Sequence, residues 1–94
     1  MERAEIEVGI ITIDERKAAY IRSKGVEPED VFEVQFNRPA YFVRSEEAGL
    51  FNMIGPNHRG RFLWASIMHV SGTEWRLITA YWNDDGRAQR RYEE

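Results

Sequence analysis

Arginines and aromatic residues gather in the last third of the chain, in a combination that can hold phosphates and flat rings. All six basic residues after position 50 are arginines. Arginine presents a bidentate fork to phosphate and stacks on rings, which lysine does not do. A genome rich in G and C would produce the same arginine usage without any function. The residues of interest are His58, Arg59, Arg61, Arg76, Tyr81, Trp82, Arg87, Arg90, Arg91 and Tyr92.

These side chains match the requirements of metal-free RNA cleavage. Attack by a 2′-hydroxyl needs a proton acceptor, positive charge beside the phosphorus and a stacked base that holds the geometry. We expect Arg61 and Arg76 to supply charge, and His58 or Tyr81 to transfer protons. The expected RNA-binding residues are Lys24, Arg59, Trp82, Arg87, Arg90, Arg91 and Tyr92. The same set also serves binding without chemistry, and the sequence leaves both open.

Other kinds of site find no support in the sequence. It contains no P-loop, no dinucleotide fingerprint, no Gly-x-Ser-x-Gly and no His-Glu-x-x-His. It has no cysteine, which excludes disulfides and thiolate ligands. The histidines, His58 and His69, are a whole predicted strand apart and cannot form a helical metal pair. We expect neither a metal nor a cofactor.

Length and composition predict one domain over residues 1–94. A chain of 94 residues with 43% hydrophobic residues can build one core. The charged start and the lack of a long apolar run predict no signal peptide, no membrane segment and a cytoplasmic location. The net charge of -3 is uneven. Residues 1–50 carry 7 basic and 11 acidic side chains, and residues 51–94 carry 6 and 5.

Apolar periodicity and turn residues divide the chain into eight elements. We predict a strand at 5–11 and a helix at 14–24, with Thr12 and Glu15 as a capping box. A second helix opens at 26–30 and ends at 37–39. Strands follow at 40–44, 50–55, 61–70 and 75–81, and Asn83 caps a last helix at 84–92.

The short loops predict an α+β fold, an antiparallel β meander with two N-terminal helices and a C-terminal helix, packed on one sheet face. Strict alternation places Leu63, Ala65 and Ile67 on one face with Arg61. On the return strand it groups Arg76 with Ala80 and Trp82. The opposite face carries Trp64, Ser66, Thr79 and Tyr81, as either an aromatic binding platform or a seat for the last helix.

Short motifs spread from about Thr12 to Tyr92 resemble the BrnT-type toxins of type II toxin–antitoxin systems. The first half carries Asp14-Glu15-x-Lys17, Lys24-Gly25-Val26 and the acidic helix Glu29-Asp30-Val31-Phe32-Glu33-Val34. The second half carries Ile54-Gly55, Gly60-Arg61-Phe62-Leu63, Arg76-Leu77-Ile78-Thr79-Ala80 and Arg90-Arg91-Tyr92. Each motif is short, and their agreement in order and spacing carries the resemblance.

The resemblance implies a RelE-like fold, ribosome-independent endoribonuclease activity and neutralisation by a ribbon-helix-helix antitoxin, with a homodimer or a heterotetramer as the assembly. Lys24, Arg61, Arg76, Arg90, Arg91 and Tyr92 match family positions.

Three features depart from the family pattern. No histidine precedes Gly25, residues 80–83 lack the usual basic pair, and residues 1–11 form a longer start. These departures support an alternative, a non-catalytic protein-interaction module that retains the toxin fold.

Overall fold

The computed structural model describes residues 3–37 and 41–93. These residues form an α+β domain, which confirms the predicted class. In chain order, the elements are β1 (Ile10–Thr12), α1 (Glu15–Arg22), α2 (Pro28–Asn37), β2 (Tyr41–Arg44), β3 (Leu50–Pro56), β4 (Phe62–Ser71), β5 (Glu74–Trp82) and α3 (Arg87–Glu93). The predicted end of the second helix at 38–39 and the predicted strand start at Ala40 lie outside the described residues.

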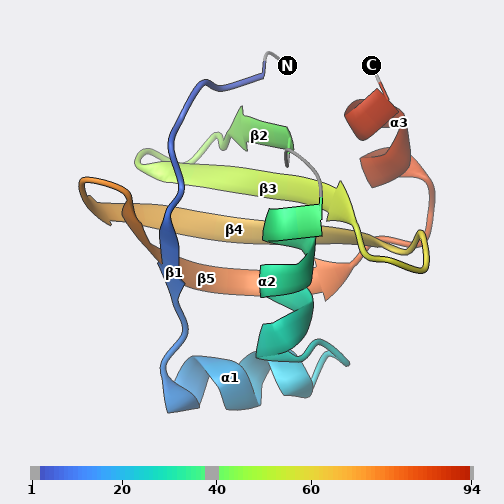
Figure 1. Cartoon of the computed structure of the whole chain (residues 1–94), viewed down its shortest axis with the longest axis horizontal. Helices are drawn as coiled ribbons and strands as arrows, with labels where there is room; N and C mark the ends of the chain where they lie inside the picture. Colours follow the sequence, from blue (N-terminus) through green and yellow to red (C-terminus); the bar gives the residue numbers. More distant parts are fainter. Residues whose placement is uncertain (1–2, 38–40, 94) are drawn as a thin grey trace.

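The strands form one sheet in the order β1-β5-β4-β3-β2 (Figure 1). Strands β2 to β5 pair antiparallel with their sequence neighbours, as the predicted meander requires. β1 pairs parallel with β5, with Ile11 beside Trp75, so the sheet is mixed rather than purely antiparallel. The short loops were sufficient to predict the meander. The pairing of β1 joins distant segments, so no local sequence pattern predicts it.

The N-terminal segment, residues 3–9, crosses one face of the sheet beside α2 (Figure 1). Ala4, Ile6 and Val8 pack half-buried against the core, and the Trp75 indole donates to the Glu7 carbonyl at 2.8 Å. The predicted strand at 5–11 is therefore wrong in extent, since strand pairing in β1 begins at Ile10. The Ala4 amide still donates to the Phe42 carbonyl of β2 at 2.6 Å, whereas the alternation of residues 5–8 serves packing on top of the sheet.

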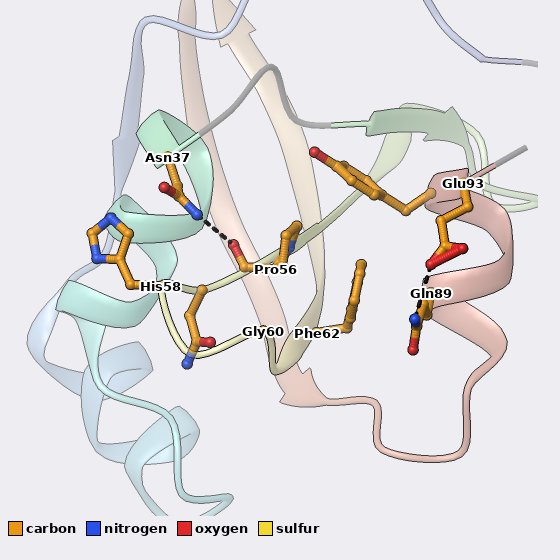
Figure 2. Close-up of a pocket in the computed structure, with 9 residues that line it drawn as sticks. Asn37, Pro56, His58, Gly60, Phe62, Gln89 and Glu93 are labelled. Atoms are coloured by element: carbon orange, nitrogen blue, oxygen red, sulfur yellow. Dashed lines mark hydrogen bonds between the residues drawn. The ribbon is translucent and has the colours of Figure 1, made fainter.

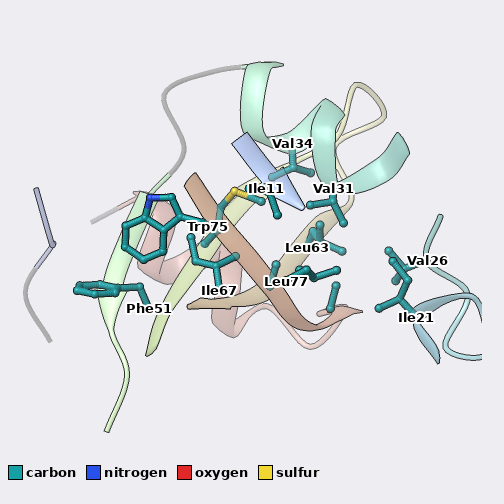
Figure 3. Close-up of a cluster of buried hydrophobic side chains, with 13 residues drawn as sticks. Ile11, Ile21, Val26, Val31, Val34, Phe51, Leu63, Ile67, Trp75 and Leu77 are labelled. Carbon is teal, nitrogen blue, oxygen red and sulfur yellow. The ribbon is translucent and has the colours of Figure 1, made fainter. Parts of the chain in front are cut away.

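The first face of the sheet, defined by Leu63, Ala65 and Ile67, carries the main core. α2 contributes Val31 and Val34, and Trp75 packs edge-on against Phe51 at a ring distance of 5.4 Å (Figure 3). Ile21 and Val26 extend this core from α1 and the turn after it. The apolar faces of α1 and α2 are thus buried against one side of the sheet.

The second face, defined by Trp64, Ser66 and Tyr81, receives α3. Ala88 of α3 is fully buried with Tyr41, Val43 and Ile54. The helices therefore lie on both sides of the sheet, and the prediction that all pack on one face is wrong. The expected seat for the last helix exists, but it occupies only part of the second face, because Trp64, Ser66, Thr79 and Tyr81 stay half-exposed.

A β-bulge at Ile78 changes the alternation of β5. Ser66 pairs with Thr79 and Ile67 with Leu77, which leaves Ile78 without a partner in β4. Arg76 therefore lies on the second face, opposite Met68, whereas Ala80 and Trp82 lie on the first. Strict alternation predicted that all three share a face, and the extra residue explains the error.

Several helix details also differ from the predictions. The N-cap of α1 is Asp14, whose carboxylate accepts the Lys17 amide at 2.7 Å, while the Thr12 hydroxyl donates to the Trp75 carbonyl. α3 begins at Arg87, later than predicted, yet Asn83 still caps its first turn by accepting the Ala88 amide at 3.1 Å.

Gly55 of β3 permits the close approach of α2. A Cβ added there would lie 3.1 Å from Cγ1 of Val34. We expect Gly55→Val to lower the free energy of unfolding by about 1–3 kcal/mol through overpacking, as measured by urea denaturation. The control, Val70→Thr at an exposed strand position, should unfold like the parent. Equal midpoints for both variants would show that α2 moves away freely.

Candidate nucleic-acid interface

Most of the predicted site residues meet at one end of the sheet. β3 ends there, β4 begins there, and β5 ends there before α3. The Trp82 indole also donates to the Gly25 carbonyl at 2.9 Å, which brings the turn that follows Lys24 to this end. We call it the arginine end. Its predicted site residues are Lys24, His58, Arg59, Arg61, Tyr81, Trp82, Arg87, Arg90, Arg91 and Tyr92.

Arg76 does not belong to this group. It lies at the start of β5, paired with Met68 near the other end of β4. At about 3.3 Å per residue, the strand path from Arg61 to Met68 covers roughly 23 Å. The side chains of Arg61 and Arg76 also belong to opposite faces. The structure therefore does not bring together the two arginines that were expected to share the stabilisation of one phosphate.

Arg61 is held by a carboxylate and a ring. Its guanidinium donates two hydrogen bonds to Asp84, at 3.1 and 3.0 Å, and lies 4.6 Å from the centre of the Trp82 ring. The hydrogen bond with Asp84 raises the pKa of Arg61 and lowers the pKa of the Asp84 carboxyl. The pair is exposed, so its charge is accessible but largely compensated.

A similar ion pair of arginine and aspartate lies at the start of α3. The Asp85 carboxylate accepts the Arg87 backbone amide and the Arg87 guanidinium, both at 3.0 Å. The backbone hydrogen bond from Arg87 is the main cause of the lowered pKa of Asp85. By contrast, Arg59, Arg90 and Arg91 form no ion pair within the described part of the chain. These three are the arginines of this end that remain available to an incoming anion.

The loop between β3 and β4 positions His58 against α2. The Asn57 side chain accepts the amides of Arg59 and Arg61, at 3.0 and 2.8 Å, and Gly60 adopts a φ of 83°. Glu33 of α2 then accepts the His58 backbone amide at 2.7 Å, and the same oxygen lies 3.0 Å from Nδ1 of the His58 ring. A carboxylate on one ring nitrogen fixes the imidazole and favours the tautomer with Nε2 free to accept a proton. Glu33 was not among the predicted site residues, because only the fold joins it to a loop 25 residues away.

An open groove of about 560 Å³ lies beside this loop. Figure 2 shows the His58 ring on the α2 side, turned away from Phe62, Gln89 and Glu93, which lie across the groove. Its lining is mostly polar and includes Asn37, Asn57 and Tyr92. Tyr92 rests against Phe62 with ring centres 5.5 Å apart. The groove thus joins two predicted site residues, His58 and Tyr92, that the sequence separates by a whole hairpin.

A second group of cations surrounds Tyr20 of α1. The ammonium groups of Lys24 and Lys17 lie 4.9 and 5.3 Å from the centre of its ring. Interaction with Lys24, followed by that with the Thr79 hydroxyl, lowers the pKa of the Tyr20 phenol. The Tyr20 side chain is 44% exposed. Lys24 therefore interacts with a ring at the edge of the sheet.

The described residues contain no cluster of three or more histidine or carboxylate side chains able to hold a metal ion. None of the helices within residues 3–37 and 41–93 is both long and apolar enough to span a membrane. The chain matches no model of a known protein family, and neither curated proteins nor solved structures yielded a match.

The environment of Tyr20 can be tested by titration. We expect one tyrosine to ionise below the others when tyrosinate absorbance is followed with rising pH. Tyr20→Phe should abolish that phase, and Lys24→Gln should shift it upward, because the neighbouring ammonium stabilises the phenolate. Arg16→Gln, an exposed change elsewhere on α1, serves as the control. A titration curve unaffected by Lys24→Gln would contradict the assignment.

Proposed function

We propose that this protein is an RNA-binding endoribonuclease that cleaves RNA without a metal, as the toxin of a toxin–antitoxin pair. The observation that carries the proposal is the His58–Glu33 pair beside the groove, with Arg59 in the same loop and Arg90 and Arg91 on α3. It combines a proton acceptor, positive charge and an open site of suitable size. The motif resemblance to BrnT-type toxins supports the same activity.

The proposed reaction begins at the free Nε2 of His58. This nitrogen accepts the proton of a ribose 2′-hydroxyl, and the 2′-oxygen attacks the adjacent phosphorus. The bond from phosphorus to the 5′-oxygen breaks, which leaves a 2′,3′-cyclic phosphate, and the departing oxygen takes up a proton. Arg59 is the nearest unpaired arginine in sequence to His58 and stabilises the charge on the phosphate oxygens. Glu33 orients the imidazole through its contact with Nδ1.

The antitoxin in this proposal is a small ribbon-helix-helix protein encoded beside the chain. Its presence can be read from the neighbouring reading frames. An adjacent gene with that pattern supports the toxin, and its absence favours the second candidate.

The second candidate is a non-catalytic module that binds another protein. Two observations favour it: Arg61 and Arg87 already have carboxylate partners, and α2 exposes Phe32 and Phe36, the latter by 72%. Such a protein would bind through an apolar helix face and would leave RNA intact.

Cleavage of naked RNA in the presence of a chelator tests the first candidate. We expect His58→Gln to slow cleavage by roughly 10²- to 10⁴-fold, as loss of a general base does. Glu33→Gln should have a smaller effect, since it only misorients the ring. His69→Gln, the matched change at the far end of the sheet, should cleave like the parent. Intact RNA with the parent protein, or full activity in His58→Gln, would refute the proposed mechanism.

Removal of the Asp84 carboxylate should free Arg61. We expect Asp84→Asn to bind RNA more tightly. Log affinity should also fall more steeply with log salt, by about 0.7 in slope, because one more cation reaches phosphate. The stability of the variant should change little, as for other exposed pairs. Glu46→Gln removes the same charge from the β2–β3 turn and is the control. Equal slopes for the two variants would show that Arg61 does not contact RNA.

A further inference from the structure

Trp64 differs from the other two tryptophans of the chain in the hydrogen bonding of its indole. The indoles of Trp75 and Trp82 donate to the carbonyls of Glu7 and Gly25. The indole of Trp64 has no hydrogen-bond partner among the described residues, and its ring is half-exposed on the second face. A buried structural tryptophan usually satisfies its N–H, whereas a ring with one face open is suited to stacking.

Trp64 belongs to a row of aromatic rings along that face. Tyr81 stands opposite it across β4 and β5, with ring centres 6.5 Å apart and planes within 10° of parallel. Phe62 precedes it by two residues on the same face, roughly 7 Å away along the strand. Tyr92 packs on Phe62 and lines the groove beside His58. All four rings are half-exposed, so the row is continuous from the groove to the C-terminal half of β5.

Polar and cationic groups continue the row beyond Tyr81. Thr79 follows on the second face, opposite Ser66. Lys17 and Lys24 lie beside the ring of Tyr20. Aromatic rings next to positive charge are typical of surfaces that bind single-stranded nucleic acid, since bases can stack on the rings while backbone phosphates meet the cations.

We propose that Tyr92, Phe62, Trp64 and Tyr81 form a track for unpaired nucleotides, which leads from the groove at His58 to the lysines beside Tyr20. This track deepens the proposed function, since it assumes that RNA is the ligand. It selects single strands, because the bases of a duplex are already stacked on one another and cannot lie on the rings. Stacking tolerates any base, so the track sets the position of the strand and not its sequence.

Binding can be measured apart from cleavage with a fluorescent single-stranded DNA oligonucleotide, which lacks the attacking 2′-hydroxyl. We expect Trp64→Leu and Tyr81→Leu each to weaken binding by about 5- to 150-fold in fluorescence anisotropy. Phe36→Leu, an exposed aromatic on α2, should bind like the parent. The duplex of the same sequence should bind more weakly than the single strand. Folded Trp64 and Tyr81 variants with parental affinity would overturn the track.

A surface variant tests the track even if the aromatic substitutions unfold the protein. In Lys24→Gln, log affinity should fall less steeply with log salt. The slope should be smaller in magnitude by about 0.7, the value for one phosphate contact on a single strand. Arg16→Gln, on α1 shortly before Lys24 in the chain, should leave the slope unchanged. Equal slopes for both variants would remove the lysine end from the track.

The outcomes separate this proposal from the proposed function. Ring-dependent binding of single strands without RNA cleavage would leave the track in place and refute the nuclease. Cleavage that depends on His58 but proceeds equally fast in folded Trp64→Leu and Tyr81→Leu would refute the track alone.

Discussion

The bulge at Ile78 determines which side chains of β5 reach each face of the sheet. On one side of it, Trp75 and Leu77 enter the main core, and on the other side Ala80 does the same. A regular strand would place Leu77 and Ala80 on opposite faces, and one of them would leave the core. Because of the extra residue, the apolar side chains on both sides of the bulge point inward, while Tyr81 is free to pair with Trp64. Both the core and the aromatic row therefore depend on this irregularity.

Carboxylates organise the arginine end as much as the arginines do. Asp84 ties the start of β4 to the loop after β5, and Glu33 ties the β3–β4 loop to α2. Exposed ion pairs add little to stability. Their effect here is geometric, because they join these loops to neighbouring elements and leave other cations of this end without an ion pair in the described residues. This explains how a chain with net negative charge can still present positive charge at one end.

Local patterns were sufficient to predict most of the fold. Alternation, turn residues and capping residues located the strands of the meander and the three helices, because those signals come from neighbours in sequence. Predictions were wrong where contacts between distant segments decide which residue caps a helix or fills the core. Thr12 looked like a helix cap, but its hydroxyl bonds to Trp75, and Asp14 takes its place. Phe32 and Phe36 of α2 are large and apolar yet exposed, because Val31 and Val34 fill the space against the sheet.

The same distinction holds for the candidate site. The order of the strands predicts that His58, Arg61 and Tyr92 lie near one end of a hairpin, since strand pairing determines where loops lie. It could not find Glu33, which meets His58 only when α2 crosses the sheet. Nor could it separate Arg76 from Arg61, because the bulge that reverses its face has no signature in the residue types around Ile78.

The parallel pairing of β1 with β5 has a consequence for biosynthesis. Ile11 leaves the ribosome well before its partner Trp75, which follows much later in the chain. A ladder between such distant segments must close a large loop, which slows folding and leaves apolar surface open in the meantime. The helices and the first hairpin can form during synthesis, but the sheet gains its final edge only after β5 has emerged. A nascent chain therefore stays without its completed core, and without the end that carries α3, until these segments have emerged.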